Sequence, residues 1–253
     1  MSLPRVLVFG HSHLGALMAA NEGEAANDAR RFEIVSYQFM REDRPHIVHL
    51  DGEWRYHPEC EKELCALISS TGPDLVVSML QGERATAAGL IAPEHPFEFH
   101  FPGEEKAFGP EAEIVPFDML IEVCRWEHGL IGELLDRMRG HVRLPSVALS
   151  PPPPIGDDAF IVASNIRHAD IGRYLRERGL PPKRWRYRVW KLHTLALRTI
   201  YWERGVAFAD PPVGAQGEDG CLLREFWSDP FHANARYGHL LLGQIQSFLR
   251  NGS

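Results

Sequence analysis

The sequence predicts an α/β protein: a flavodoxin-like, three-layer α/β/α sandwich around a mostly parallel five-stranded sheet. Short aliphatic and β-branched runs alternate with longer helical patterns from the first residues onward, as in βα units. With 253 residues and 44% hydrophobic content, the chain is long enough to bury one full core. We therefore expect a single domain over residues 1–253, with an inserted excursion at about 83–116.

Each predicted element follows from its local pattern. The predicted strands are short apolar runs bounded by turn residues: Arg5–Phe9, Glu33–Phe39, Asp74–Leu80, Pro145–Leu149 and Gly205–Phe208. The predicted helices carry apolar residues at helical spacing: Leu14–Ala20, Pro58–Ser70, Phe117–Arg139, Lys183–Arg204 and Asn234–Leu249. The second helix, for example, collects Leu64, Leu67 and Ile68 on one side and ends at Thr71-Gly72-Pro73.

The segment from Gly82 to Pro116 has no regular period. Prolines interrupt it repeatedly, and Phe97, Phe99 and Phe101 lie between them. Loops of this length are uncommon in compact domains unless they carry function, so the segment is a candidate lid or pocket wall. Its phenylalanines could equally fill part of the main core.

Composition limits the partners and the compartment. A formal net charge of -7 gives no cationic footprint for nucleic acid, and no apolar stretch reaches the roughly 20 residues of a membrane helix. The four cysteines form neither a CxxC pair nor a disulfide framework, which favours free thiols in the cytoplasm. We expect a small-molecule partner, without nucleic acid or membrane, and the sequence indicates no particular oligomeric state.

Two short motifs at opposite ends of the chain carry candidate chemistry. Ser12 follows the first strand in Phe9-Gly10-His11-Ser12-His13 and precedes a helix, so its hydroxyl should project at the carboxyl edge of the sheet, where α/β folds bind ligands. The helix N-terminus there favours negative charge on a reacting oxygen. A serine at this position could also be a simple helix N-cap.

The second motif is Ser228-Asp229-Pro230-Phe231-His232, just before the last helix. An aspartate three residues ahead of a histidine can hold one imidazole nitrogen and leave the other free for a serine. The pair could also be a turn cap beside an exposed histidine.

Together the two motifs resemble the SGNH (GDSL-like) hydrolase family, in element order over the whole chain. The resemblance implies that Ser12 is the nucleophile, His232 the general base and acid, and Asp229 the residue that orients His232. It implies an oxyanion hole formed by the backbone N–H of Ser12 with Gly82 and Gly52. The expected activity is that of a serine esterase or deacylase acting on a small acyl ester, with a carbohydrate as one candidate alcohol.

The chain departs from the family pattern in two places. Gly10-His11-Ser12 replaces Gly-Asp-Ser, and Glu83 stands about where an oxyanion-hole asparagine is expected. Gln81 or Arg84 could take over that donor role, and both, with His13, are candidate substrate-binding residues. A degenerate SGNH fold that only binds its ligand, or an acyltransferase that uses the same triad, therefore remain alternatives.

No cofactor is expected. The chain has no GxGxxG or P-loop for a dinucleotide or nucleoside triphosphate, and its histidines lack HExxH spacing, so no dedicated metal site is predicted. The tetrapeptide from Gly10 to His13 has histidines like those of metallophosphoesterases, but the Asp-x-His and Gly-Asn-His-Asp blocks of those enzymes are missing.

Overall fold

A computed structural model describes residues 3–27, 29–40, 43–81, 89–104, 113–143, 145–164 and 169–251. Its central sheet contains five parallel strands in the order β2-β1-β5-β8-β9, which confirms the predicted fold class. The strands are β1 (Arg5–Gly10), β2 (Glu33–Gln38), β5 (Leu75–Met79), β8 (Val147–Leu149) and β9 (Ala207–Ala209).

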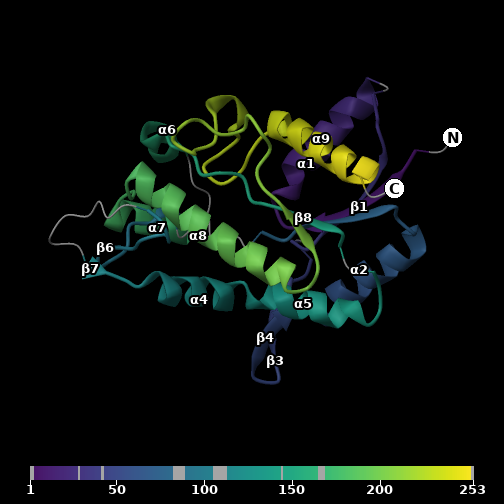
Figure 1. Cartoon of the computed structure of the whole chain (residues 1–253), viewed down its shortest axis with the longest axis horizontal. Coiled ribbons are helices and arrows are strands. Elements are labelled where there is room, and N and C mark those ends of the chain that lie inside the picture. Colours follow the sequence, from purple (N-terminus) through teal and green to yellow (C-terminus); the bar gives the residue numbers. More distant parts are fainter. Residues whose placement is uncertain are drawn as a thin grey trace.

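Helices cover both faces of this sheet (Figure 1). On one face lie α1 (Leu14–Ala26) and α9 (Ala235–Asn251), and on the other lie α2 (Pro58–Thr71), α5 (Gly129–Arg139) and α8 (Lys183–Trp202). Side chains alternate along β1, so Val6 and Val8 enter the first layer while Leu7 and Phe9 enter the second. Both faces are buried, which explains why the strand sequences are almost continuously apolar.

The remaining elements lie around this sandwich. They are the hairpin strands β3 (Ile47–Leu50) and β4 (Glu53–Tyr56), the short strands β6 (Phe97–Glu98) and β7 (Glu113–Ile114), helices α4 (Phe117–Glu127), α6 (Asp158–Ala163) and α7 (Ala169–Arg178), and a 3₁₀ turn at Arg224–Phe226. Among the helices in the described ranges, none combines the length and the apolarity needed to cross a bilayer. All four cysteines are free thiols, as expected.

The single helix predicted over Phe117–Arg139 is in fact two helices. The chain breaks at His128, which ends α4 and starts α5 with φ -91° and ψ 2°. The break turns the imidazole of His128 inward, 3.0 Å from a ring nitrogen of His193 on α8. Apolar spacing alone could not show this break, because the apolar positions continue through it on both sides.

Phe99 and Phe101, in the segment from Gly82 to Pro116, belong to an apolar cluster rather than to a pocket wall. Phe99 and Phe101 are 1% and 5% exposed and pack with Trp185, Val189 and other residues of α8. The prediction that they shape the pocket is therefore wrong for these two residues, since α4 and α8 enclose them. Phe108 lies outside the described residues.

The close packing of α1 and α9 depends on Gly238. A Cβ atom built there would lie 2.0 Å from the carbonyl oxygen of Ala16. We expect Gly238→Ala to lower the free energy of unfolding by about 1–3 kcal/mol, because a methyl group must push the two helices apart. Urea unfolding measures this change in free energy.

The matched control is Gly243→Ala on the same helix, where a Cβ would meet nothing within 4 Å and better helix propensity should stabilise the protein by up to about 1 kcal/mol. Equal effects of the two substitutions would contradict the packing argument.

Candidate active site

Ser12 lies in a tight turn between β1 and α1. The turn is held by hydrogen bonds from the Leu14 N–H to the His11 carbonyl oxygen (3.1 Å) and from the Gly15 N–H to the Ser12 carbonyl oxygen (3.0 Å). Gly10 ends the strand where a Cβ would lie 2.7 Å from the Met79 carbonyl oxygen on β5, so only glycine fits. Ser12 is half-buried between two buried histidines, and the turn fixes its hydroxyl at the carboxyl edge of the sheet.

Asp229 and His232 lie in a second turn, immediately before α9. Asp229 Oδ1 accepts hydrogen bonds from the backbone N–H groups of Phe231 (2.8 Å) and His232 (3.0 Å), which curl the turn around the carboxylate. Asn234 then caps α9, because its Oδ1 accepts from the Arg236 N–H (2.9 Å). Its Nδ2 also donates to the Trp227 carbonyl oxygen (3.0 Å), which ties the turn to the preceding segment.

The structure brings Ser12, His232 and Asp229 together, although 220 residues separate the serine from the histidine. His232 Nε2 lies 2.8 Å from Ser12 Oγ, and His232 Nδ1 lies 2.9 Å from Asp229 Oδ2. In this arrangement an imidazole can take a proton from the serine hydroxyl while the carboxylate fixes its orientation. The side chains of Asp229 and His232 are 48% and 30% exposed, so a ligand can reach them.

The carboxylate of Asp229 is held in its charged form. Burial by itself would raise the pKa of this group, but the hydrogen bond from His232 and the backbone hydrogen bonds outweigh it and lower the pKa below its ordinary value. Its charge is therefore present at neutral pH, where it can stabilise a positive imidazole.

His13 is a neutral neighbour of this pair. Its ring centroid lies 5.2 Å from that of His232. Burial lowers the pKa of His13 to about 3, and His232 lowers it further while Asp229 opposes the shift. Because His13 is uncharged, only His232 of these two histidines can form an ion pair with the Asp229 carboxylate when its imidazole is protonated.

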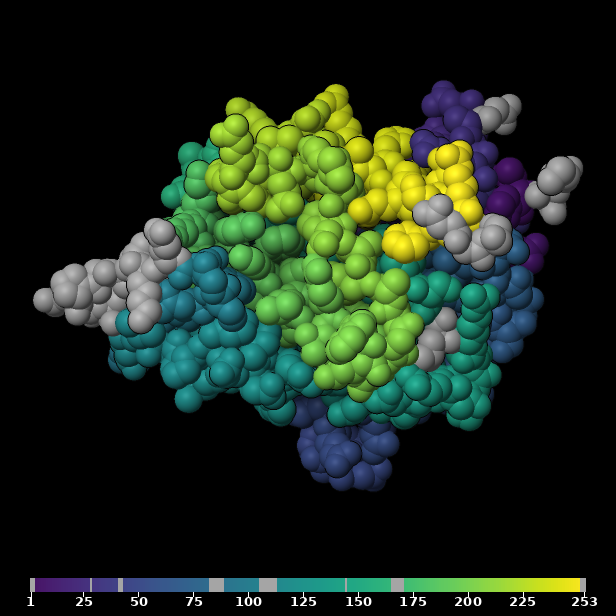
Figure 2. Space-filling view, in the orientation of Figure 1, coloured from purple at the N-terminus to yellow at the C-terminus, as the bar shows by residue number. Residues whose placement is uncertain are grey.

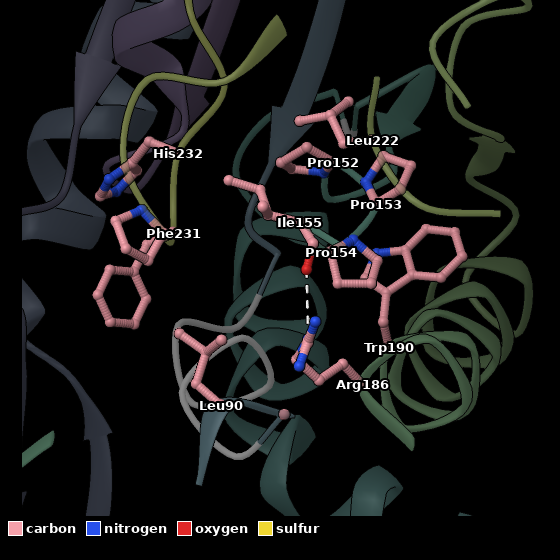
Figure 3. A pocket seen from close by; sticks show the side chains of 12 residues that line it. Leu90, Pro152, Pro153, Pro154, Ile155, Arg186, Trp190, Leu222, Phe231 and His232 are labelled. Carbon is pink, nitrogen blue, oxygen red and sulfur yellow. Dashed lines mark hydrogen bonds between the residues drawn. The ribbon is translucent and has the colours of Figure 1, made fainter. Parts of the chain in front are cut away.

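An apolar pocket opens beside the triad (Figure 3). Its space is about 430 Å³, including the open mouth. The view shows Phe231 and His232 on one side, facing Leu90, Ile155 and the proline run across the gap. The lining residues come from five parts of the chain: Gly89, Leu90, Pro152, Pro153, Pro154, Ile155, Arg186, Trp190, Leu222, Pro230, Phe231 and His232. Prolines give such a wall a fixed shape, which suits a site that must hold a ligand still.

Among the described residues that line this pocket, the one cation, Arg186, already has partners within the protein. Arg186 donates to the carbonyl oxygens of Ile155 (3.2 Å) and Gly156 (3.1 Å) and pairs with Asp158 (2.7 Å). The buried indole N–H of Trp190, by contrast, has no acceptor among the described residues. The pocket therefore favours an uncharged group that brings at most one hydrogen-bond acceptor.

Gly52 does not belong to this site, and the expectation that it forms part of the oxyanion hole is wrong. It occupies the exposed turn between β3 and β4, and Figure 2 shows this hairpin projecting, in dark blue, from the body of the molecule. Asp51 and Gly52 have φ values of 55° and 88°, which a two-residue hairpin turn requires. The glycine is needed by the turn rather than by a ligand.

Gln81 and His13 lie beside the triad but not in the apolar pocket. Both line a smaller cavity between α1, α9 and the end of β5, together with Tyr237. Both amide hydrogens of Gln81 are used, because Nε2 donates to the carbonyl oxygens of Leu149 (2.9 Å) and Ser150 (2.8 Å). The Gln81 Nε2 group is thus used within the protein, and substrate contact by Gln81 or His13 stays a prediction. Gly82, Glu83 and Arg84 lie outside the described residues.

Sequence reasoning missed several residues that build the site. Asn234 had a readable signal, because an asparagine directly before a helix is a strong N-cap. Leu90 lies in the segment from Gly82 to Pro116, which the sequence predicts as a candidate pocket wall without singling out this residue. Trp190 had no signal, since its place in the pocket depends on how distant segments pack. The Asp51-Gly52 hairpin did have a signal, the Asp-Gly pair between two short strands.

Comparisons with known proteins found similar chains among solved structures only. No family model matches the sequence, and no curated protein matches it. Among solved structures, a GDSL-like lipase from Bacteroides thetaiotaomicron overlaps 98% of this chain and 89% of its own length, with 10% identity and a TM-score of 0.49. A lipase/acylhydrolase from Enterococcus faecalis overlaps 97% and 96%, with 12% identity and a TM-score of 0.40.

An extracellular lipase from Streptomyces rimosus overlaps 96% of this chain and 99% of its own, with 11% identity and a TM-score of 0.44. At such low identities and TM-scores below 0.5, the function has to be inferred from the site itself.

Proposed function

We propose that the protein is a serine hydrolase that cleaves a small, uncharged acyl ester. The observation that carries this is the continuous chain of contacts from Ser12 Oγ through His232 to Asp229, at 2.8 and 2.9 Å. One member of this chain of contacts, His232, also lines an apolar pocket whose walls include a proline run. A hydroxyl, a base and an orienting carboxylate beside an apolar pocket suit acyl transfer better than binding alone.

The reaction follows from these positions. Ser12 Oγ attacks the ester carbonyl carbon as its proton passes to His232 Nε2, and Asp229 stabilises the resulting imidazolium. The tetrahedral intermediate collapses when His232 returns the proton to the departing alcohol, which leaves an acyl group on Ser12. Water then attacks this acyl-enzyme with His232 again as the base, and releases the acid.

The developing oxyanion needs at least one hydrogen-bond donor. The backbone N–H of Ser12 is the described candidate, at the N-terminal end of α1, where the helix dipole favours negative charge. Gly82 stays a candidate for a second donor on the family resemblance alone.

The pocket's chemistry limits the acyl group. Its described walls are apolar and Arg186 is occupied by protein oxygens, so a charged acyl group would be buried without a partner among the described residues. We therefore expect short, neutral acyl chains to be preferred over long or anionic ones.

A fluorophosphonate probe tests the proposal. We expect it to label the wild-type protein at Ser12, and to label Ser70→Ala equally, whereas Ser12→Ala should not react. Acetyl and butyryl esters should be cleaved faster than octanoyl or succinyl esters. A folded wild type that neither reacts with the probe nor cleaves any of these esters would refute hydrolysis and favour the ligand-binding alternative. A new ester formed with an added alcohol would instead indicate an acyltransferase.

A further inference from the structure

A cluster of metal-ligand side chains lies where α4 and α5 meet α8. Cys124, Glu127 and His128 occupy the last turn of α4 and the residue after it, a spacing of three and four positions that places them on one helix face. His193 faces them from α8, 65 residues later than His128. Three of these residues, Cys124, Glu127 and His193, gather around one point, and His128 lies beside them in contact with His193.

The distances fit coordination of a single ion. The ligand atoms of Cys124, Glu127 and His193 all lie within 4.8 Å of one another. His193 Nδ1 lies 3.8 Å from Glu127 Oε2 and 3.0 Å from His128 Nε2. Around a tetrahedral Zn²⁺ with bond lengths of about 2.0–2.3 Å, the ligand atoms are separated by about 3.3–3.8 Å. The ligand atoms of Cys124, Glu127 and His193 would therefore need to shift by up to about an ångström to bind one ion.

The surroundings also suit a closed site. Cys124, His128 and His193 are buried, while the Glu127 side chain is 28% exposed and gives the ion a path from solvent. Cys124 belongs to the apolar cluster of α4 and α8, with Leu192 and Ala196 around it. An apolar shell of this kind limits the access of solvent to a bound ion.

We propose that Cys124, Glu127, His128 and His193 form a binding site for a divalent transition metal ion, with Zn²⁺ as the best match to sulfur, nitrogen and oxygen ligands. On binding, the thiol proton of Cys124 leaves to solvent and an Sγ–metal bond replaces it. In the metal-free protein, His128 Nε2 and His193 Nδ1 share a proton through their hydrogen bond. On binding, both nitrogens direct a lone pair to the ion, and the shared proton moves to the other nitrogen of the ring that carried it.

The ion would brace α8 against the junction of α4 and α5. Because α8 also carries Trp190 and Arg186, it would hold one wall of the apolar pocket in place. The sequence alone does not indicate this site, because His193 lies 65 residues after His128, too far for a motif of closely spaced ligands.

Binding of Co²⁺ to the metal-free, reduced protein tests the proposal. We expect one equivalent to produce a thiolate-to-cobalt charge-transfer band and the visible bands of a tetrahedral site, and one equivalent of Zn²⁺ to displace it. Zn²⁺ should also raise the thermal unfolding midpoint. Absence of the thiolate band in folded wild-type protein would refute the proposal.

Variants locate the site. Cys124→Ser should abolish the thiolate band, and His193→Ala should weaken Zn²⁺ binding at least about tenfold. Cys60→Ser removes an equally buried thiol outside the cluster and should leave both readouts unchanged. If Cys124→Ser does not fold, His193→Ala and Glu127→Gln decide the outcome. A band retained at full strength in those variants, or lost in Cys60→Ser, would place the ion elsewhere and overturn the assignment.

Discussion

Replacing Ser12 or His232 by alanine is expected to lower kcat for a short acyl ester by about 10⁵–10⁶, and replacing both should cost hardly more. The physical reason is that the two side chains act as one unit. Without the imidazole at 2.8 Å the hydroxyl keeps its proton and is a poor nucleophile, and without the hydroxyl the base has nothing to activate.

Asp229→Asn should cost about 10⁴ in kcat, because an amide could hold His232 in the wrong tautomer while leaving the turn intact. Initial rates at saturating ester measure all of these effects, and circular dichroism checks the fold. Ser70→Ala and His239→Gln, on exposed surfaces, are the matched controls and should be fully active. Losses that multiply in the Ser12 and His232 double variant would show that the residues act independently, and would count against a triad.

Mild acid is expected to destabilise the protein strongly, because two imidazoles are buried uncharged beside the active site. His11 and His13 are 4% and 7% exposed, and burial lowers the pKa of each to about 3. For His11, the nearby His46 and His13 contribute to this lowered pKa. In the unfolded chain both groups return to a pKa near 6.5 and take up protons that the folded state excludes.

Stability from such groups is fully present above pH 6.5 and is lost as the pH falls toward about 3. Between pH 7.5 and pH 5 each imidazole should remove about 2 kcal/mol from the free energy of unfolding. His128 and His193, whose pKa values burial lowers to about 3 and 4, act in the same direction.

Urea unfolding at several pH values, with a chelator present, measures this dependence. His13→Gln should weaken the loss between pH 7.5 and pH 5 by about 2 kcal/mol, whereas His239→Gln, at an exposed position, should leave it unchanged. A wild-type stability that stays constant from pH 7.5 to pH 5 would show that these imidazoles are not buried as neutral groups.

The sequence by itself determined the fold class and the candidate triad, because both depend on local signals. Apolar runs of strand length between helical patterns predict a parallel sheet. The sheet's topology then places the residues after β1 and before α9 at one site, so Ser12, Asp229 and His232 could be named from their positions in the chain.

Tertiary packing decided the rest. Gly52 could be assigned to the hairpin only once β3 and β4 paired. The hydrogen bond from the Gln81 side chain to the end of β8 likewise appears only in the folded structure. Phe99 and Phe101 fill the core because α8 lies over them, and the break at His128 turns an imidazole toward His193. Each of these depends on contact between segments far apart in the chain, which residue type and spacing do not encode locally.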